Sequence, residues 1–279
     1  MAYSIPTDLH DALVALAAGA RPIAGGTDLY ASLGEGLPKG DLVDLTRIGG
    51  LGGIGHTGNG WRIGATATWS QIARADLPPA FAALQQAARE VGALQVQNAG
   101  TIGGNLVNAS PAADGVVPLL LLDAEVEVTS LGATRHLPLS EFLVGPRQTA
   151  LRQGEVLRAI HLPAPPAGRS AFAKLGSRAY LVISFVMVAA LLELDRGVIR
   201  TARIAVGACS PVARRLSALE EALTGQDVAL LGESLQITAT HLAPLAPIDD
   251  LRADAAYRLD AARVLVRRAL LQAAGMANG

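Results

Sequence analysis

Hydrophobic residues at the start of the chain follow a helical spacing first and strand-like runs afterwards. Leucines recur every third or fourth position over residues 7–18, which places them on one face of a helix, and Gly19 closes this helix. Short apolar segments at residues 21–24 and 41–45 predict strands, with a short helix between them that runs to about Leu33. The pattern therefore predicts a small α/β subdomain.

The glycine-rich segment G-I-G-H-T-G, residues 53–58, has the spacing of a Rossmann dinucleotide fingerprint. That fingerprint has to follow a strand and open a helix. Here it is followed by Asn59-Gly60, a strong signal for a hairpin turn. We therefore predict a β-hairpin, with His56 as an exposed residue of its turn.

The middle of the chain predicts mostly short helices. Residues 68–74 and 79–91 have helical patterns, and the polar stretch 95–98 leads into a glycine-rich segment. Residues 116–122 predict a short helix, because Pro118 suits only its first turn. Residues 124–130 alternate between apolar and acidic, as a half-buried strand does.

The segment P-A-P-P-A-G-R, residues 163–169, is the clearest linker and predicts a domain boundary. Beyond it the pattern predicts an antiparallel three-stranded sheet with helices on one side. The predicted strands are 170–175, 184–194 and 201–207, and the predicted helices are 212–223, 227–241 and 255–274. The expected fold class is α+β, with domains at 1–55, 56–165 and 166–279.

Composition narrows the classes of function. The net charge of −1 gives no electrostatic argument for nucleic acid or for an anionic membrane. Cys209 is the lone cysteine, which excludes an internal disulfide framework and any iron–sulfur cluster held by this chain alone. Charged residues make up only 17%, which indicates either surface covered by partners or an Ala- and Arg-rich compositional habit.

Location is predicted from two segments. The N-terminal sequence M-A-Y-S-I-P-T-D resembles no secretory signal. The most apolar run, residues 179–192, is shorter than the roughly 20 residues that a membrane-spanning helix needs. We expect a cytoplasmic protein without a membrane span.

Two glycine pairs carry the candidate chemistry. Residues 98–114 read N-A-G-T-I-G-G-N-L-V-N-A-S-P-A-A-D, and residues 21–29 read R-P-I-A-G-G-T-D-L. Adjacent glycines let the main chain approach a ligand, and successive N–H groups in such a bend form an anion site. The two bends predict a clamp for the diphosphate of a dinucleotide, with Asp114 left to bind hydroxyl groups. The alternative for each bend is a tight turn that holds no ligand.

The helix that follows the first glycine pair adds to this hypothesis. Thr27 or Asp28 is expected to cap that helix, and a helix N-terminus is itself favourable for anions.

The motif A-G-G-T-D followed by T-I-G-G-N-L-V-N-A-S-P-A-A-D resembles the FAD-binding subunit of the molybdenum hydroxylases. That family includes the medium subunit of carbon monoxide dehydrogenase and the flavin segment of xanthine dehydrogenase. The resemblance extends over nearly the whole chain. It implies a two-subdomain FAD-binding domain with a vanillyl-alcohol-oxidase-like flavin fold, followed by the α+β domain predicted above.

The resemblance also implies which residues hold a non-covalent FAD. They are Ala24, Gly25, Gly26, Thr27, Asp28, Thr101, Ile102, Gly103, Gly104 and Asn105 at the diphosphate, Asp114 at the ribose, the main chain of Leu157 at the adenine, and Lys174 and Tyr180 near the flavin ring. A cation at the N1–C2=O edge of a flavin stabilises its anionic reduced form.

Each of these assignments has a plain structural alternative. Asp114 is otherwise a loop cap, Leu157 part of an ordinary edge strand, Lys174 a solvated lysine at a strand end, and Tyr180 a core tyrosine. Asp28 is a further candidate to face the flavin.

The histidines predict no metal. His10, His56, His136, His161 and His241 are scattered singly, and no pair has the sequence spacing of a metal site. The motifs of zinc proteases, P-loop NTPases and α/β-hydrolases do not occur. No residue of the chain is predicted to be catalytic in its own right.

The predicted function is that of an FAD-dependent oxidoreductase subunit in a heterotrimeric molybdenum hydroxylase. The resemblance implies a molybdopterin-binding large subunit that oxidises the substrate and a small subunit with 2Fe-2S clusters that passes the electrons on. FAD in this chain then delivers them to a terminal electron acceptor. The alternatives are a stand-alone FAD-dependent oxidoreductase with its own small substrate, and a nucleotide-binding or scaffold protein without redox activity.

Overall fold

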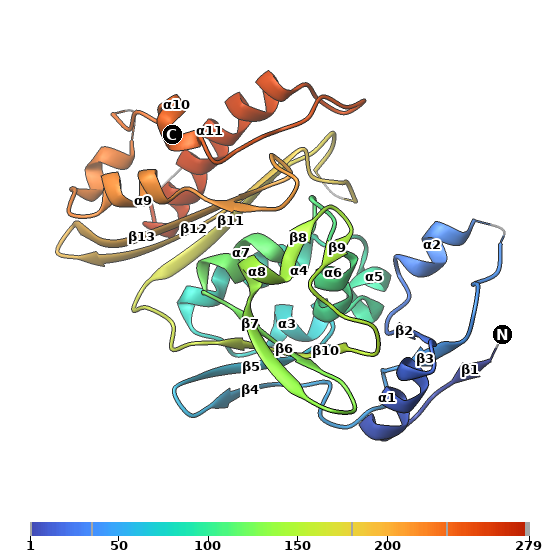
Figure 1. The fold of residues 1–279 in the computed structure, drawn as a ribbon. Helices are drawn as coiled ribbons and strands as arrows, with labels where there is room; N and C mark the ends of the chain where they lie inside the picture. The colour runs from blue at the N-terminus through green and yellow to red at the C-terminus, as the bar shows by residue number, and fades with distance from the viewer. Residues whose placement is uncertain (1, 35, 180, 233, 277–279) are drawn as a thin grey trace. The chain divides into compact units, whose positions relative to one another are not determined.

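The computed structural model describes residues 2–34, 36–179, 181–232 and 234–276. The chain forms two compact units, and neither is continuous in sequence (Figure 1). Unit 1 contains residues 1–75, 93–109 and 123–164, and unit 2 contains residues 76–92, 110–122 and 165–279.

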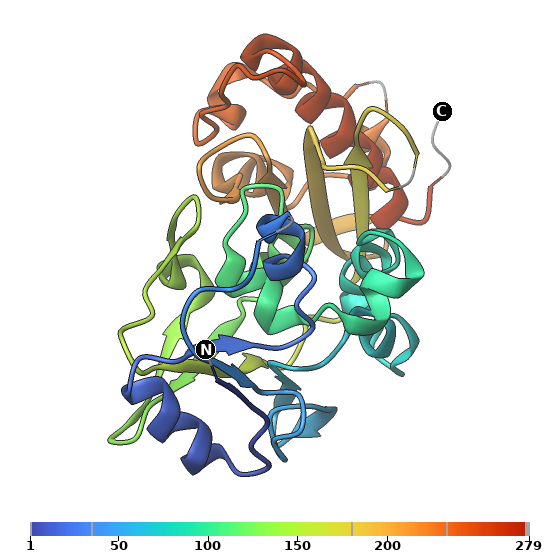
Figure 2. The same ribbon diagram turned by 90° about the vertical axis from the view of Figure 1, so that its right-hand side faces the viewer.

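Unit 1 begins with the predicted α/β subdomain. A parallel sheet in the order β1-β3-β2 lies beside the first helix (Figure 2). Leu13 and Leu16 of that helix are buried against Val43, because the leucines share one helical face as the sequence indicated. The elements are β1 (Tyr3–Ser4), α1 (Leu9–Ala17), β2 (Arg21–Ile23), α2 (Leu29–Leu33) and β3 (Leu42–Asp44).

The rest of unit 1 is built on an antiparallel five-stranded sheet in the order β4-β5-β10-β6-β7. Its strands are β4 (Ile54–Thr57), β5 (Gly60–Gly64), β6 (Glu125–Thr129), β7 (Thr134–Pro138) and β10 (Val156–Leu162). The other elements of this part are α3 (Trp69–Arg74), α5 (Leu94–Ala99), α6 (Ile102–Asn108), α8 (Leu139–Phe142), β8 (Leu143–Gly145) and β9 (Gln148–Thr149).

The hairpin prediction is confirmed, since β4 and β5 pair across the two turn residues Gly58 and Asn59, with Thr57 opposite Gly60. His56 is exposed, as predicted, but it lies in β4 and not in the turn. Its ring meets the ring of Trp61, the residue opposite it in β5, edge-on with 5.6 Å between the ring centres. The polar stretch 95–98 is helical, within α5, where no helix was expected.

Unit 2 is built on an antiparallel sheet in the order β11-β12-β13-β14. Its elements are η1 (Pro79–Phe81), α4 (Ala82–Glu90), α7 (Val116–Leu121), β11 (Arg169–Leu175), β12 (Val186–Asp195), β13 (Val198–Gly207), β14 (Arg214–Arg215), α9 (Ser217–Leu223), η2 (Val228–Leu231), α10 (Ala239–Leu242) and α11 (Ala255–Ala273).

The three long strands were predicted. The two-residue β14 was not, because residues 212–216 were assigned to a helix that begins only at Ser217. The helix predicted over 227–241 is two short turns, η2 and α10.

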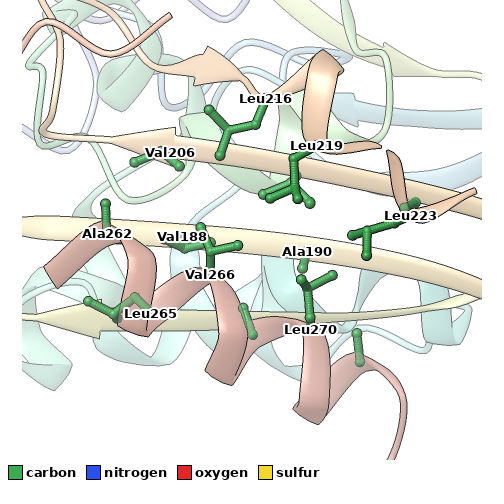
Figure 3. Packing of buried hydrophobic residues seen from close by; sticks show 14 of the residues in the cluster. Val188, Ala190, Val206, Leu216, Leu219, Leu223, Ala262, Leu265, Val266 and Leu270 are labelled. Carbon is green, nitrogen blue, oxygen red and sulfur yellow. The ribbon is translucent and has the colours of Figure 1, made fainter. Parts of the chain in front are cut away.

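One face of this sheet is covered by α9 and α11. Figure 3 shows Leu219 of α9 and Val266 of α11 over Val188 of β12 and Val206 of β13, and all four side chains are buried. Alternate residues of a strand point to opposite faces, so Met187 and Ala189 face the other way. They are fully buried too.

The second face is covered by helices from the middle of the chain, which were not expected to pack on this sheet. A Cβ on Gly207 of β13 would stand 3.0 Å from Cγ1 of Val117 in α7. The buried hydroxyl of Ser170 in β11 donates to the carbonyl oxygen of Ala80 and accepts from the N–H of Ala83, both at 2.8 Å. Arg203 of β13 donates to the carbonyl oxygen of Leu121 at 2.6 Å, at the end of α7. The helices predicted at 79–91 and 116–122 therefore belong to unit 2.

Candidate functional site

The two glycine motifs meet in unit 1. A Cβ on Gly25 would stand 1.8 Å from the carbonyl oxygen of Ala99, so only glycine allows this contact. Ala99 immediately precedes the segment Gly100–Asn105. The hydroxyl of Thr27 lies close as well, because a Cβ on Gly100 would be 3.4 Å from Thr27 Oγ1. Two bends separated by about seventy residues in the sequence (residues 25 and 99) thus form one surface.

The first motif offers unused main-chain donors. None of the N–H groups of residues 25–28 donates a hydrogen bond to a residue that the structure describes. Gly26 has a φ of +67°, which reverses the chain within this loop. A Cβ there would stand 2.5 Å from the ring of Tyr30, a residue that sequence analysis did not single out. Successive free N–H groups around a left-handed residue are suited to an anion.

Capping of α2 by Thr27 or Asp28 was expected and is wrong. Asp28 is the N-cap residue, but its own backbone is helical and its side chain makes no capping hydrogen bond within the described chain. The Asp28 side chain is exposed.

The second motif is not a left-handed corner, as its glycine pair suggested, but the start of α6. The hydroxyl of Thr101 caps this helix by accepting from the N–H of Gly104 at 3.1 Å. Gly103 is needed for packing, because a Cβ there would stand 2.6 Å from the carbonyl oxygen of Ala65. Ile102 points into the core and is fully buried.

The N–H groups of residues 102–105 in this second motif already donate within the chain. Those of Ile102 and Gly103 donate to the carbonyl oxygens of Ala67 and Ala65 at 3.0 and 2.8 Å. The N–H of Asn105 donates to the carbonyl oxygen of Thr101 at 3.0 Å. The loop at 25–28 therefore has N–H groups that donate to no described residue, whereas α6 contributes a close approach of its main chain.

Gly104 and Asn105 are the parts of α6 left for a ligand. Gly104 is exposed, and a Cβ there would meet only Thr101 Oγ1, at 3.0 Å, among the described atoms. The side-chain oxygen of Asn105 is buried and has no hydrogen-bond partner among the described residues. Buried polar atoms are rarely left without a partner, so this amide fits a site completed by a bound group.

A pocket in unit 1 collects several of the predicted residues. Ala24, Thr101, Gly103, Gly104 and Leu157 all line it. Leu157 belongs to β10, which is the central strand of its sheet, so the alternative of an edge strand is wrong. The pairing of β10 with β6 shifts register between Leu157 and Ala159.

Unit 2 holds the other predicted side chains in a buried cluster. Lys174 Nζ donates to Asp114 Oδ2 at 2.6 Å, and Ser184 Oγ donates to Asp114 Oδ1 at 2.7 Å. The side chains of Lys174 and Asp114 are only 7% and 9% exposed. Lys174 is therefore not a solvated lysine at a strand end, and both oxygens of Asp114 already have donors.

Burial controls the charges of this cluster. It raises the pKa of Asp114, while Lys174 and Ser184 act in the opposite direction. It also raises the pKa of Glu90, at the end of α4, and Asp114 adds to that effect whereas Lys174 opposes it. Ser184 and Glu90 were missed by the sequence analysis. Ser184 is the one polar residue within an apolar run, which is the signal that could have identified it.

Tyr180 lies outside the described residues, so its predicted place near the flavin stays a prediction.

Similar proteins identify the class. Residues 1–165 match the family described as "FAD binding domain in molybdopterin dehydrogenase", and residues 171–273 match "CO dehydrogenase flavoprotein C-terminal domain". The chain is 30% identical over 285 residues to the xanthine dehydrogenase FAD-binding subunit of Escherichia coli O157:H7, across 99% of this chain and 97% of the relative.

Carbon monoxide dehydrogenases are similar in sequence and in structure. The chain is 32% identical over 286 residues to the carbon monoxide dehydrogenase medium chain of Afipia carboxidovorans, across 99% of this chain and 97% of the relative. The structure of reconstituted CO dehydrogenase from Oligotropha carboxidovorans matches with a TM-score of 0.89 at 29% identity, across 99% of this chain and 98% of that chain.

The fold and these matches define a flavoprotein subunit of an oxidoreductase complex. The chain belongs to the FAD-binding subunits of the molybdenum hydroxylase family, and FAD is its cofactor. The resemblance drawn from the two glycine motifs is thereby confirmed, and the alternative of a stand-alone flavoenzyme is disfavoured. Of the helices in the described part of the chain, none is long and apolar enough to cross a membrane.

Proposed function

We propose that this chain is the electron-exit subunit of a three-part complex. A molybdopterin-binding large subunit oxidises the substrate, a small subunit with 2Fe-2S clusters carries the electrons, and this chain passes them to a terminal acceptor. When bound, FAD supplies the chemistry that links one-electron carriers to acceptors of one or two electrons. The lone cysteine supports this division of labour, because this chain cannot by itself supply the thiolates of an iron–sulfur cluster.

The names of the relatives support a second part of the proposal. One belongs to a xanthine dehydrogenase and another to a carbon monoxide dehydrogenase, yet both align with nearly the whole of this chain. These two substrates have little chemistry in common. We infer that the substrate of the complex is selected by another subunit.

The observation that carries the cofactor assignment is the loop at residues 25–28. The N–H groups of this loop donate to no described residue, and its Gly25 lies against Ala99 and Gly100 at the start of the second motif. In that motif Gly104 is exposed, and Asn105 Oδ1 is buried without a partner among the described residues. We propose that this loop donates to the FAD diphosphate. The exposed face of Gly104 then lets the cofactor come close, and the Asn105 amide hydrogen-bonds to it.

The remaining assignments rest on the family resemblance. We propose that the main chain of Leu157 binds the adenine and that Asp114 accepts from the ribose. Lys174 and Tyr180 are proposed to serve the flavin ring. Asp114 and Lys174 would have to make these hydrogen bonds in addition to their own ion pair. This is chemically possible, because a carboxylate can accept several hydrogen bonds and an ammonium group can donate three.

The diphosphate assignment is tested by Gly104→Val. A Cβ at this position meets only the Thr101 hydroxyl among the described atoms within 4 Å, so the variant should fold. It should lose most of its FAD, because the side chain occupies the approach to the loop at 25–28. Gly132→Val is the matched control, since a Cβ at Gly132 meets no described atom within 4 Å.

Flavin absorbance per chain and the circular dichroism of both variants are the measurements. If the Gly104→Val variant folds and still binds a full complement of FAD, the diphosphate does not bind at this position. A separate experiment tests whether the chain belongs to a three-part complex. The chain is tagged in its own cells, and the large molybdopterin-binding subunit and the small 2Fe-2S subunit should co-purify with it. Turnover of a substrate by the purified chain alone would contradict the proposed division of labour.

A further inference from the structure

A second cluster of ligand-type side chains lies on the five-stranded sheet of unit 1, on strands β6, β7 and β10. Glu127 of β6 stands directly across from His136 of β7. His161 of β10 stands across from Glu125, two positions along β6 on the same face of the sheet. None of these residues belongs to the predicted cofactor site.

The three side chains converge on one point. His161 Nε2 and Glu127 Oε2 are 2.7 Å apart, and the ring centres of His136 and His161 are 5.0 Å apart. One ligand atom from each of Glu127, His136 and His161 lies within 4.8 Å of the other two. Bonds of about 2.0–2.1 Å to a tetrahedral ion separate ligand atoms by roughly 3.3 Å. A modest rotation of one side chain therefore brings all three to bonding distance.

His136 is the side chain that can make this movement. It is exposed and lies on β7, the edge strand of the sheet. Glu127 is buried and held in place, because Arg158 Nη1 donates to its other oxygen, Oε1, at 2.8 Å. That ion pair uses Oε1 and leaves Oε2, which now contacts His161, as the oxygen that can bind an ion.

We propose that Glu127, His136 and His161 form a binding site for a divalent transition-metal ion, with Zn²⁺ as the natural occupant. Two imidazoles and one carboxylate are a donor set that zinc uses in proteins, with water completing the coordination. Oxygen-only ions such as Mg²⁺ and Ca²⁺ are disfavoured by the imidazoles. Bound zinc ties the edge strand β7 to the central strand β10, the strand that also lines the pocket described above.

Neighbouring cations set the expected strength. Arg158 pairs with Glu127 directly, and Arg62 Nε lies 4.0 Å from Oε2. Both charges repel a second cation, so the affinity should fall well short of that of a closed four-ligand structural zinc site.

The test is zinc binding by the full-length, FAD-loaded chain against a chromophoric chelator. The wild type should bind one Zn²⁺ through this site. His136→Ala and His161→Ala should each weaken that binding at least about tenfold. His56→Ala is the matched control, because His56 is an exposed histidine on β4 of the same sheet and is not part of the cluster.

A thermal-unfolding series with added ZnCl₂ gives a second readout that does not depend on enzyme activity. Zinc should raise the midpoint of the wild type and of His56→Ala but not that of His136→Ala. His136 is exposed, so its removal does not threaten the fold. Equal zinc affinity and equal thermal shifts in wild type and His136→Ala would overturn the proposal, as would zinc binding that depends on His56.

Discussion

The main chain of Gly25 lies against the carbonyl oxygen of Ala99, so close that a Cβ on Gly25 would stand 1.8 Å from that atom. This contact brings the two glycine motifs together. It also shows that a glycine in such a motif can serve the protein's own packing. Gly25 and Gly103 meet neighbouring backbone, whereas Gly104 is exposed.

Gly25→Ala should lose both stability and cofactor. The added Cβ cannot avoid the backbone of Ala99, so the loop at 25–28 has to shift, at a cost of about 1–3 kcal/mol. Chemical denaturation and flavin content after purification are the measurements. Gly49→Ala is the control, because a Cβ at Gly49 meets no described atom within 4 Å and its φ is not positive. A Gly25→Ala variant with wild-type stability and full FAD would show that the contact does not hold the site together.

Lys174→Met should destabilise unit 2 by about 3–5 kcal/mol, because it leaves the buried carboxylate of Asp114 without its cation. The double variant Lys174→Met with Asp114→Leu removes both charges and should regain most of that loss. Urea unfolding of Lys174→Met, of Asp114→Leu and of the double variant gives the coupling energy between the two side chains. Additive losses in the two single variants would mean that the pair contributes no interaction of its own.

The proposed role of Lys174 at the flavin has a separate readout. If the ammonium group stabilises the anionic reduced flavin, FAD-loaded Lys174→Met should have a lower midpoint potential than the wild type. Spectroelectrochemical titration measures this potential. A variant that retains FAD at the wild-type potential would limit Lys174 to its ion pair with Asp114.

Arg258→Met should destabilise the protein by about 3 kcal/mol. This buried guanidinium on α11 donates to the carbonyl oxygen of Phe185 at 2.6 Å and to Asp250 Oδ1 at 2.8 Å. Arg263→Met on the same helix is the control, since Arg263 pairs with an exposed Asp260 and such pairs contribute about 0–1 kcal/mol. The thermal-unfolding midpoint of Arg258→Met should lie clearly below that of Arg263→Met. Equal midpoints would contradict the larger contribution predicted for Arg258.

Glu90→Gln should stabilise the protein near pH 7. Burial raises the pKa of Glu90 above its ordinary value of 4.5. Its protonated form therefore stabilises the fold fully below pH 4.5, and this stabilisation is lost as the pH rises through the folded pKa. The advantage of Glu90→Gln should shrink toward zero as the pH falls to about 4. Denaturation curves across this range, with the exposed Glu221→Gln alongside, check the sign. A constant difference at all pH values would contradict it.

Local structure could be predicted where one short segment contains its own signal. Asn59-Gly60 specifies a hairpin and Pro118 the first turn of α7, and both are confirmed. The start of α6 was misjudged, because two glycines lower helix propensity. Its stability comes from the Thr101 cap and from the packing of Gly103 against Ala65, which no local pattern reveals.

Contacts between distant segments could be predicted where two similar motifs suggested a shared ligand, and otherwise could not. The two glycine motifs were expected to meet, and they do. The pairing of Asp114 with Lys174 and Ser184 was not foreseen, because the residues were judged singly as cofactor ligands. His136 and His161 lie far apart in the sequence and become neighbours through the pairing of strands β7, β6 and β10.

The packing of α4 and α7 against the C-terminal sheet affects how the chain can fold while it is still being synthesised. Every residue of α7 is buried, and strands β12 and β13, which emerge much later, form a large part of its cover. During synthesis this apolar helix lacks that part of its cover until β13 has emerged. A nascent chain that stops after Pro165 would carry the whole first family segment and still expose that surface, so release from the ribosome at that point favours aggregation over folding.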